Sequence, residues 1–320
     1  MPEAHVYSIA LTTRFRGIDV REGLLLRGDA GWGEFSPFLE YDEPTALPWL
    51  LAAREAADLG WPEPVRTQIP VNVTVPACDP ERARTIVLGS NGCRTAKVKV
   101  AEPGQSLAED QARLEAVRDA LGPHGLIRID ANGGWSVEEA IAAIPLLDRA
   151  AGGLEYVEQP SPTVEDLAAV RRGVAVPIAA DESIRRAADP YRVRDLDAAD
   201  IAVLKVQPLG GVRACLRIAA DIGLPVVVSS AIETSVGIAA GLALAAALPS
   251  LEHACGLATV QLLADDVATA PLLPVDGMLP VGAVSVDPAR LARSAATVDR
   301  AEHWLARMTA VAALGQDQSL

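Results

Sequence analysis

From residue 68 onward, short apolar runs alternate with helical patterns about every 25 to 30 residues. Runs of this kind, bounded by turn residues, are typical of strands in a parallel sheet. The predicted strands are 69–75, 95–100, 126–131, 154–159, 177–182, 200–206, 225–230 and 251–257. The predicted helices between them are 79–89, 107–121, 137–150, 163–172, 189–197, 212–222 and 235–248, and SVEE at 136–139 has the pattern of a capping box at a helix start.

Strands that alternate with helices predict βαβ units. Eight such strands fit a closed barrel better than an open sheet. No regular helix follows the eighth strand, because residues 265–287 are rich in proline and look like a path back to the first part of the chain. A last helix is predicted over about 288–312, followed by a loose tail, GQDQSL.

The beginning of the chain has a different pattern. Residues 6–29 alternate loosely, like a meander of antiparallel strands, and GWGEFSPF follows at 31–38. Residues 44–59 have a helical pattern that ends at Gly60. The predicted division is an N-terminal α+β part (1–66), the barrel (67–262), and a return segment with a C-terminal helix that packs on both (263–320).

Composition and charge narrow the possible partners. The chain has 320 residues, half of them hydrophobic, which suits one α/β barrel of roughly 250 residues plus a smaller domain. The net charge of -14 argues against nucleic acid or an anionic membrane, since both need basic patches. The net charge does not exclude a small anionic substrate that binds at a locally positive site. The longest apolar stretch, 236–248, predicts a buried helix and no membrane span.

The cysteines and the N-terminus indicate a cytoplasmic protein. The four cysteines are scattered without a C-x-x-C pair, and the chain opens without a signal-peptide pattern. We therefore expect reduced thiols. The four histidines have no metal-ligand spacing and are interpreted as structural or surface residues. The oligomeric state is left open, and a monomer is compatible with the sequence.

Charged residues end most of the predicted barrel strands, which is where such barrels carry their chemistry. Three consecutive strands end in the carboxylates Asp130, Glu158 and Asp181. Neighbouring strands lie about 4.8 Å apart, so three acids in one concave site would repel one another unless a cation is bound. All-oxygen ligands favour Mg²⁺ over zinc. We therefore expect these three residues to bind Mg²⁺.

Lysines flank these acids on both sides. Alternation along the second strand puts Lys97 and Lys99 on one face, pointing into the barrel, and Lys205 ends the sixth strand. The second and sixth strands are opposite in a ring of eight, so Lys99 and Lys205 should face each other across the metal. The seventh strand ends in Ser229 and Ser230.

This arrangement suits removal of a proton next to a carboxylate. Such a proton is very weakly acidic, because its loss places a second negative charge on the same group. Mg²⁺ on the carboxylate stabilises the resulting enediolate. A lysine acts as a base only as the neutral amine, and both the metal and Lys97 favour that form of Lys99. We expect Lys99 to be the base.

Five motifs in chain order, AKVKV, RIDAN, VEQP, AADES and VLKVQPLGG, resemble the enolase superfamily and, within it, the muconate-lactonizing subgroup. GWGEFSPF resembles the signature of its capping domain, and DGMLPVG (276–282) the return into that domain, so the likeness covers nearly the whole chain. It implies a TIM-like (β/α)7β barrel with an N-terminal α+β capping domain completed by the C-terminal segment. PVGAVSV stands where many relatives have a Gly-Pro-Gly-Leu run, which we interpret as a local loop difference.

The resemblance also implies roles for the site residues. The three carboxylates would bind Mg²⁺. Lys99 would remove the proton and then help water leave from the same face, while Lys205 would stay protonated and support the enediolate from the opposite face. Lys97 would support Lys99 electrostatically. Asn132 and Glu182 would support the metal ligands.

Within the subgroup, SSAIETSVG (229–237), GLATVQLLADDV (256–267) and the compact length resemble the o-succinylbenzoate synthase family. This implies a Mg-dependent carbon-oxygen lyase that converts 2-succinyl-6-hydroxy-2,4-cyclohexadiene-1-carboxylate to 2-succinylbenzoate by syn-dehydration, in menaquinone biosynthesis. Segments near 14–18 and 38–42 would cover the substrate. The residues expected to contact it are Asn132, Ser229, Ser230 and Gly237, the last three at its succinyl group.

Other functions use similar residues. N-acylamino acid racemases and dipeptide epimerases of the same superfamily use both lysines as bases, although CGLATVQ lacks the acidic D-x-D typical of the epimerases. Muconate cycloisomerisation is a further option. A Schiff-base aldolase could use Lys205, but it leaves the three acids without a role. A non-catalytic binding or scaffold protein would be favoured by loss of an acid or lysine, and none is lost.

Overall fold

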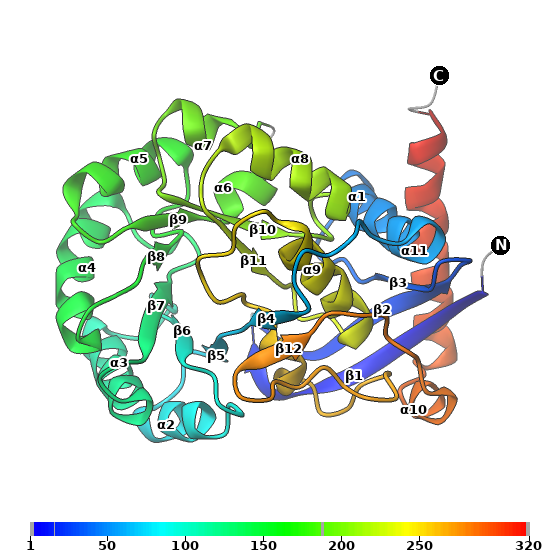
Figure 1. The fold of residues 1–320 in the computed structure, drawn as a ribbon, viewed down its shortest axis with the longest axis horizontal. Helices are drawn as coiled ribbons and strands as arrows, with labels where there is room; N and C mark the ends of the chain where they lie inside the picture. Colours follow the sequence, from blue (N-terminus) through cyan, green and yellow to red (C-terminus); the bar gives the residue numbers. More distant parts are fainter. Residues whose placement is uncertain (1–2, 16, 187–188, 318–320) are drawn as a thin grey trace.

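The computed structural model describes residues 3–15, 17–186 and 189–317, and it contains a barrel with a smaller capping domain beside it (Figure 1). Seven strands form one curved parallel sheet in the order β11-β10-β9-β8-β7-β6-β5. They are β5 (Val73–Val75), β6 (Thr95–Lys99), β7 (Leu126–Asp130), β8 (Val157–Glu158), β9 (Ile178–Ala180), β10 (Ile201–Lys205) and β11 (Val226–Ser229). Strand neighbours in the sheet are also neighbours in the chain, as successive βαβ units require.

Helices follow the strands and cover the outside of the sheet (Figure 1). The predicted capping box at Ser136 is present, and Ser106 forms a second one at the start of the preceding helix. The predicted helix 189–197 is reduced to four residues, and the short α6 was not predicted. The helices are α2 (Pro80–Leu88), α3 (Leu107–Leu121), α4 (Val137–Ala151), α5 (Val164–Gly173), α6 (Glu182–Arg185), α7 (Arg192–Asp195), α8 (Val212–Ile222) and α9 (Ser235–Ala247).

The eighth barrel segment is less regular than predicted. Within residues 251–257, Cys255 forms an isolated parallel bridge with Val71, and Gly256 forms one with Ser229. The carbonyl oxygen of Ala254 accepts a hydrogen bond of 2.8 Å from the guanidinium of Arg128. A side chain thus takes the place of a strand neighbour there. The two bridges still join β11 to the segment before β5, and so they connect the two edges of the sheet.

The capping domain consists mainly of an antiparallel sheet and two helices. The sheet has the order β1-β2-β3, with β1 (Glu3–Phe15), β2 (Ile18–Arg27) and β3 (Trp32–Phe35). The predicted meander over 6–29 is therefore confirmed, and β3 within GWGEFSPF adds a third strand that was not predicted. The predicted helix 44–59 is α1 (Glu43–Arg54) continued by a π-helical turn, η1 (Glu55–Leu59). Asp42 caps its start, and its end is at Gly60, which has a φ of 66°.

The chain then returns to this domain through several short elements. The predicted first strand is split, because β4 (Gln68–Pro70) leaves the barrel and pairs antiparallel with β12 (Met278–Pro280). The 3-10 helix η2 (Ala258–Leu262) precedes β12.

The C-terminal helix differs from the prediction, because it is broken into α10 (Pro288–Arg293) and α11 (Val298–Asp317). Ser294 and Ala296 hydrogen-bond to the backbone of β1 instead of continuing the helix. Helix α11 also extends into the segment predicted as a loose tail, and residues 318–320 of that tail lie outside the described residues.

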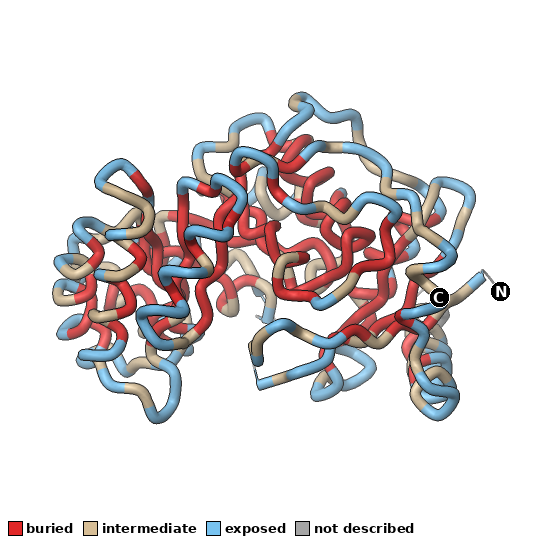
Figure 2. Tube along the Cα trace, turned by 90° about the horizontal axis from the view of Figure 1, so that it is seen from below, coloured by how far each residue is buried: buried red, intermediate tan, exposed pale blue. Residues whose placement is uncertain are grey.

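The core fills the space between the barrel sheet and its helices, and Figure 2 shows the buried backbone concentrated inside a more exposed outer layer. The stretch 236–248, predicted as a buried helix, is α9, in which every residue from Ser235 to Ala246 is buried. This helix lies between the barrel and the capping domain, so both of its sides are covered. Over the described part of the chain, no helix has the length and apolarity to cross a membrane.

Candidate active site at the carboxyl ends of the strands

Strand register brings the predicted acids and lysines to one rim of the barrel. Lys99 is paired with Asp130 across β6 and β7, and Asp130 is paired with Glu158 across β7 and β8. Asp181 directly follows β9, and Lys205 is the last residue of β10. Because parallel strands present their carboxyl ends at the same rim, five consecutive strands gather residues that are far apart in the sequence.

The two lysines of β6 both contact the acids. The Nζ of Lys97 lies 3.0 Å and 3.2 Å from the two carboxylate oxygens of Glu158, and 3.3 Å from Oδ2 of Asp130. The Nζ of Lys99 lies 2.5 Å from the same Asp130 oxygen and 2.6 Å from Oδ1 of Asn132. Val98, on the other side of the strand, is fully buried in the packed core. TAKVKV therefore has a charged inner face and an apolar outer face.

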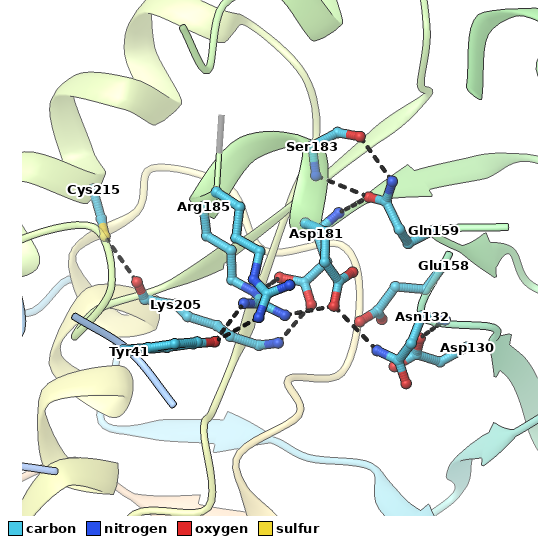
Figure 3. Close-up of polar contacts among 12 residues, drawn as sticks. Tyr41, Asp130, Asn132, Glu158, Gln159, Asp181, Ser183, Arg185, Lys205 and Cys215 are labelled. Atoms are coloured by element: carbon cyan, nitrogen blue, oxygen red, sulfur yellow. Dashed lines mark hydrogen bonds and ion pairs between the residues drawn. The ribbon is translucent and has the colours of Figure 1, made fainter. Parts of the chain in front are cut away.

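On the other side of the rim, Asp181 is held between two cations (Figure 3). Its Oδ2 accepts from Nζ of Lys205 at 2.6 Å, and its Oδ1 accepts from Nε of Arg185 at 2.8 Å. Arg185 also donates to Glu182 at 2.5 Å. Lys205 is 9% exposed and Asp181 is fully buried, so this ion pair is shielded from bulk water.

Two amide side chains fix the loops between these strands. The Nδ2 of Asn132 donates to Glu182 at 3.2 Å, and its backbone N–H donates to Asp130 at 3.0 Å. The Oε1 of Gln159 accepts from the backbone N–H groups of Asp181 and Ser183. Asn132 and Gln159 have φ angles of 47° and 40°. These left-handed conformations turn the chain sharply after β7 and β8, which lets the amides reach the neighbouring loops.

Charge and burial together set the protonation states. Burial alone would lower the pKa of Lys97, but Glu158 and Asp130 raise it above its usual range, so Lys97 stays protonated. Burial raises the pKa of Glu158 to about 7, and the nearby Asp130 adds to this effect. Burial also opposes ionisation of Asp130, but Lys99 and Lys97 hold its pKa below its usual range. Burial lowers the pKa of Lys205, and Asp181 opposes that change.

The chemistry of the three carboxyl groups fits a divalent cation that prefers oxygen ligands. Asp130, Glu158 and Asp181 are at most 1% exposed and lie on adjacent strands. The raised pKa of Glu158 reflects burial and the repulsion from Asp130 and Asp181 that a cation would relieve. In the structure each carboxylate is turned toward a lysine or arginine, and no three His, Cys, Asp or Glu side chains of the described residues form a metal-binding arrangement. The three carboxyl groups are therefore suitable ligands for a divalent cation. In the structure their side chains are oriented toward lysine and arginine, with which they form ion pairs.

A cavity of about 320 Å³ opens above this rim. Its charged lining residues include Lys97, Lys99, Lys205 and two arginines. Ser229 and Ser230, which were predicted to contact the substrate, are among the residues that line it, and so is Asn132. The remaining lining residues are Phe15, Phe38, Thr74, Pro76, Ala77, Glu102, Glu182, Arg185, Arg186, Pro208, Ala231, Ile232, Gly256 and Thr259.

Gly237 lies behind the cavity wall, on α9, and is not among the residues that line the cavity. A Cβ atom at this position would come within 2.5 Å of Cβ of Glu233 and within 2.7 Å of Nε2 of Gln207. Its backbone N–H donates to Glu34 of the capping domain at 3.0 Å. The glycine thus permits close packing beneath the 229–234 loop.

Several residues of the cavity were not predicted from the sequence. Phe15 and Phe38 belong to the capping segments near 14–18 and 38–42 that were expected to cover the substrate, although residue 16 lies outside the described residues. Arg185 could have been identified from the sequence. It follows Glu182 by three residues and Asp181 by four, a spacing at which side chains on one face of a helix form ion pairs. Nothing in the sequence indicated Arg186, whose guanidinium donates to the hydroxyl of Tyr41 at 3.1 Å.

A buried polar cluster joins the capping domain to the barrel next to this cavity. Glu34 on β3 accepts hydrogen bonds from Tyr7 (2.7 Å), from Ser36 (2.8 Å) and from the backbone and hydroxyl of Thr234 at the start of α9. Glu233 accepts from the backbone N–H of Ala231 at 2.7 Å. Both carboxyl groups are at most 3% exposed. The sequence contained GWGEFSPF and SSAIETSVG as separate motifs, and only the fold shows that they meet.

Replacing Glu233 with glutamine is expected to change the pH dependence of stability. Burial, with Glu34 adding to it, raises the pKa of Glu233 to about 7, compared with about 4.3 in an unfolded chain. The stability contributed by the neutral carboxyl is complete below about pH 4.3 and is lost as the pH rises through the folded-state pKa. Glu233→Gln should therefore gain about 2 to 3 kcal/mol relative to wild type between pH 5 and pH 8. Denaturant unfolding at both pH values measures this, and a constant difference would contradict the raised pKa.

Comparisons with known proteins agree with this fold. Residues 6–57 match the enolase N-terminal domain-like family, and residues 81–285 match the enolase C-terminal domain-like family. Among solved structures, the muconate lactonizing enzyme from Pseudomonas fluorescens, complexed with muconolactone, superposes with a TM-score of 0.80 at 22% identity, over 92% of this chain and 98% of that one. The L-Ala-D/L-Glu epimerase from Bacillus subtilis gives a TM-score of 0.76 at 25% identity, over 89% and 97% of the two chains.

Similarity at the level of sequence is higher with another group. The chain is 64% identical to the o-succinylbenzoate synthase of Thermobifida fusca over 307 residues, which cover 96% of this chain and 95% of that protein. It is 56% identical to the o-succinylbenzoate synthase of Mycolicibacterium smegmatis, over 97% and 95% of the two chains. These matches confirm the predicted barrel with its capping domain and the predicted family. The chain therefore belongs to the enolase superfamily and, within it, to the o-succinylbenzoate synthase family.

Proposed function

We propose that this protein is a dehydratase that converts 2-succinyl-6-hydroxy-2,4-cyclohexadiene-1-carboxylate to 2-succinylbenzoate and water. One observation carries the proposal: Lys99 and Lys205 line the same cavity from strands on either side of three buried carboxylates. The curated relatives named o-succinylbenzoate synthase support it, because they match nearly the full length of the chain. Five basic side chains line the cavity of a protein with a net charge of -14, which favours an anionic substrate.

Asp130, Glu158 and Asp181 would hold the divalent cation that enzymes of this superfamily use, and we propose Mg²⁺. When bound, the cation supplies positive charge to the substrate carboxylate and so stabilises the additional negative charge that forms on proton removal. Against the effect of burial, the ion pairs of the rim hold the pKa values of Asp130 and Asp181 below their usual range, and Lys97 lies against the carboxyl group of Glu158. Asn132 and Glu182 hold the loops that carry these carboxylates, because they join the ends of β7 and β9.

Lys99 would act as both base and acid. As the neutral amine it takes the proton from the carbon next to the carboxylate, and as the ammonium it returns that proton to the departing hydroxyl, which leaves as water. Both events occur on one face of the ring, which is the geometry of a syn elimination. Lys97 stays protonated beside Glu158 and would support Lys99 electrostatically. Lys205, on the opposite side, would place its ammonium against the developing negative charge.

Ser229, Ser230 and Asn132 would contact the substrate from the cavity wall. The hydroxyl of Ser230 lies 2.7 Å from that of Thr259, so this pair offers both a donor and an acceptor to the succinyl group. Gly237 would act indirectly, by allowing α9 to pack against Glu233. Phe15 and Phe38 would cover the ring from the capping domain.

The experiment is a conversion assay with the purified protein and Mg²⁺, in which chromatography separates substrate from 2-succinylbenzoate. We expect turnover of the cyclohexadiene and no exchange of the substrate α-proton through Lys205. The same protein is then incubated with N-acylamino acids and with dipeptides in deuterated water. Racemisation with exchange through both lysines, in the absence of dehydration, would overturn the proposed reaction and leave the superfamily assignment intact.

We also propose a cytoplasmic location and the division of the chain into 1–66, 67–262 and 263–320. All four cysteines are free thiols, and three of them are buried in the barrel, which suits a reducing compartment. The return segment pairs with β4 and β1, which supports a C-terminal part that completes the capping domain. Limited proteolysis at the two boundaries tests the division.

A further inference from the structure

Ile232 stands in the cavity wall in a strained backbone conformation. It lines the cavity after β11, and its φ angle is 64°. A β-branched residue in the left-handed region is a genuine outlier, because its side chain crowds the backbone. Such a conformation persists only where the surrounding contacts hold it in place. The contacts of Ile232 therefore indicate what keeps this part of the wall in shape.

Arg21 of the capping domain supplies one of these contacts. It lies on β2, is 2% exposed, and its Nε donates to the carbonyl oxygen of Ile232 at 3.1 Å. The same guanidinium donates to Ser36 at 3.0 Å and lies 4.6 Å from the ring centroid of Phe38. Phe38 also lines the cavity. One buried side chain thus contacts a cavity residue of the barrel and a cavity residue of the capping domain, without lining the cavity itself.

The ends of the same loop are held separately. Glu233 accepts from the backbone N–H of Ala231, on the side before Ile232. Glu34 accepts from the backbone N–H of Thr234, on the side after it. These two carboxyl groups fix the loop ends, and the carbonyl of Ile232 between them accepts a hydrogen bond from Arg21. The strained conformation of Ile232 therefore depends on more than the loop itself, because the donor to its carbonyl, Arg21, belongs to the capping domain.

We propose that Arg21 is a positioning residue that holds Ile232 and Phe38 in the cavity wall and so sets the shape of the apolar part of the cavity that receives the substrate. This inference rests on the proposed function. Arg21 does not touch the reacting atoms, so it acts through these two wall residues on binding more than on proton transfer. Loss of the guanidinium would let the loop relax toward an unstrained conformation, and the wall would no longer match the substrate.

The test measures the affinity of 2-succinylbenzoate, the proposed product, by calorimetry, together with the kcat and KM of the conversion. We expect Arg21→Gln to weaken product binding and raise KM by at least about tenfold, with a smaller change in kcat. Arg21→Lys should have an intermediate product affinity. Its ammonium can stay near Phe38, but it lacks the planar guanidinium that donates to both Ser36 and Ile232. The matched control is Arg300→Gln, which breaks an ion pair with Glu22 in the same domain, away from the cavity. It should leave product affinity unchanged.

A double-mutant cycle separates positioning from a general structural role. Glycine adopts a positive φ without strain, so Ile232→Gly removes the need for Arg21 to hold the turn. Arg21→Gln should then weaken product binding much less in the Ile232→Gly background than in the wild-type background. Equal losses in both backgrounds would overturn the proposal. So would unchanged product affinity in folded Arg21→Lys, which keeps the buried positive charge. If wild type neither turns over the substrate nor binds the product, the proposed function itself has failed.

Discussion

Lys99→Ala is expected to lower kcat for dehydration by about 10⁴-fold, the upper end of what one positioned acid–base group contributes. The loss is this large because the same amine would both remove the proton and return it to the leaving hydroxyl. The fold should persist, because Asp130 still has Lys97 at 3.3 Å and the backbone N–H of Asn132 at 3.0 Å. The measurement is single-turnover conversion, with circular dichroism to establish folding.

Lys99→Arg provides the matched control for charge. Arginine keeps a positive charge next to Asp130, but it does not release a proton at neutral pH. If Lys99 acts through proton transfer, Lys99→Arg should be as inactive as Lys99→Ala. An arginine variant that retains a tenth or more of wild-type kcat would show that the charge alone is sufficient and that the base lies elsewhere.

Removal of the metal, or of its proposed ligand Asp130, is expected to have the second largest effect. Chelation with EDTA should stop turnover, and added Mg²⁺ should restore it. Asp130→Asn should lower kcat by about 10³-fold or more, because several kcal/mol of stabilisation of the developing charge are lost. Bound ligand at 100 times its dissociation constant stabilises the folded state by about 2.7 kcal/mol. Wild type should therefore melt a few degrees higher in Mg²⁺, and Asp130→Asn should show no such shift.

Asp110→Asn is the control for this variant. Asp110 is also a buried, ion-paired aspartate of the barrel, 2.6 Å from Arg113, but it lies outside the carboxylate cluster. Both substitutions should destabilise the protein, since each leaves a buried cation with fewer partners. Only Asp130→Asn should abolish the thermal shift with Mg²⁺. A normal shift in that variant would contradict the assignment of Asp130 as a ligand.

The position of the acids and lysines could be predicted because it depends on local rules. Alternation along β6 puts Lys97 and Lys99 on the same face, whatever surrounds the strand. Parallel strands in consecutive βαβ units have their carboxyl ends at the same rim, so Asp130, Glu158 and Asp181 had to converge once the strands were identified. No long-range information was needed beyond the order of the motifs.

Predictions failed where a side chain or another segment replaced a regular backbone partner. The eighth strand is reduced to two bridges, since Arg128 binds the carbonyl of Ala254. The last helix is broken at Ser294, because residues 294–296 hydrogen-bond to β1. In both places the hydrophobic pattern is compatible with a continuous element. Local patterns do not record which distant donor or acceptor comes close.

The barrel, the capping domain, and the strands that carry the charged residues follow from periodicity and from the order of short motifs. How the cavity is closed depends instead on contacts between distant segments that form only in the folded protein. Arg21 contacts both Ile232 and Phe38 in the cavity wall, and Glu34 meets the start of α9, about 200 residues further along the chain. The contacts of Arg21 with Ile232 and of Glu34 with Thr234 join the capping domain to the barrel, and the relative position of the partners depends on the packing of the whole interface.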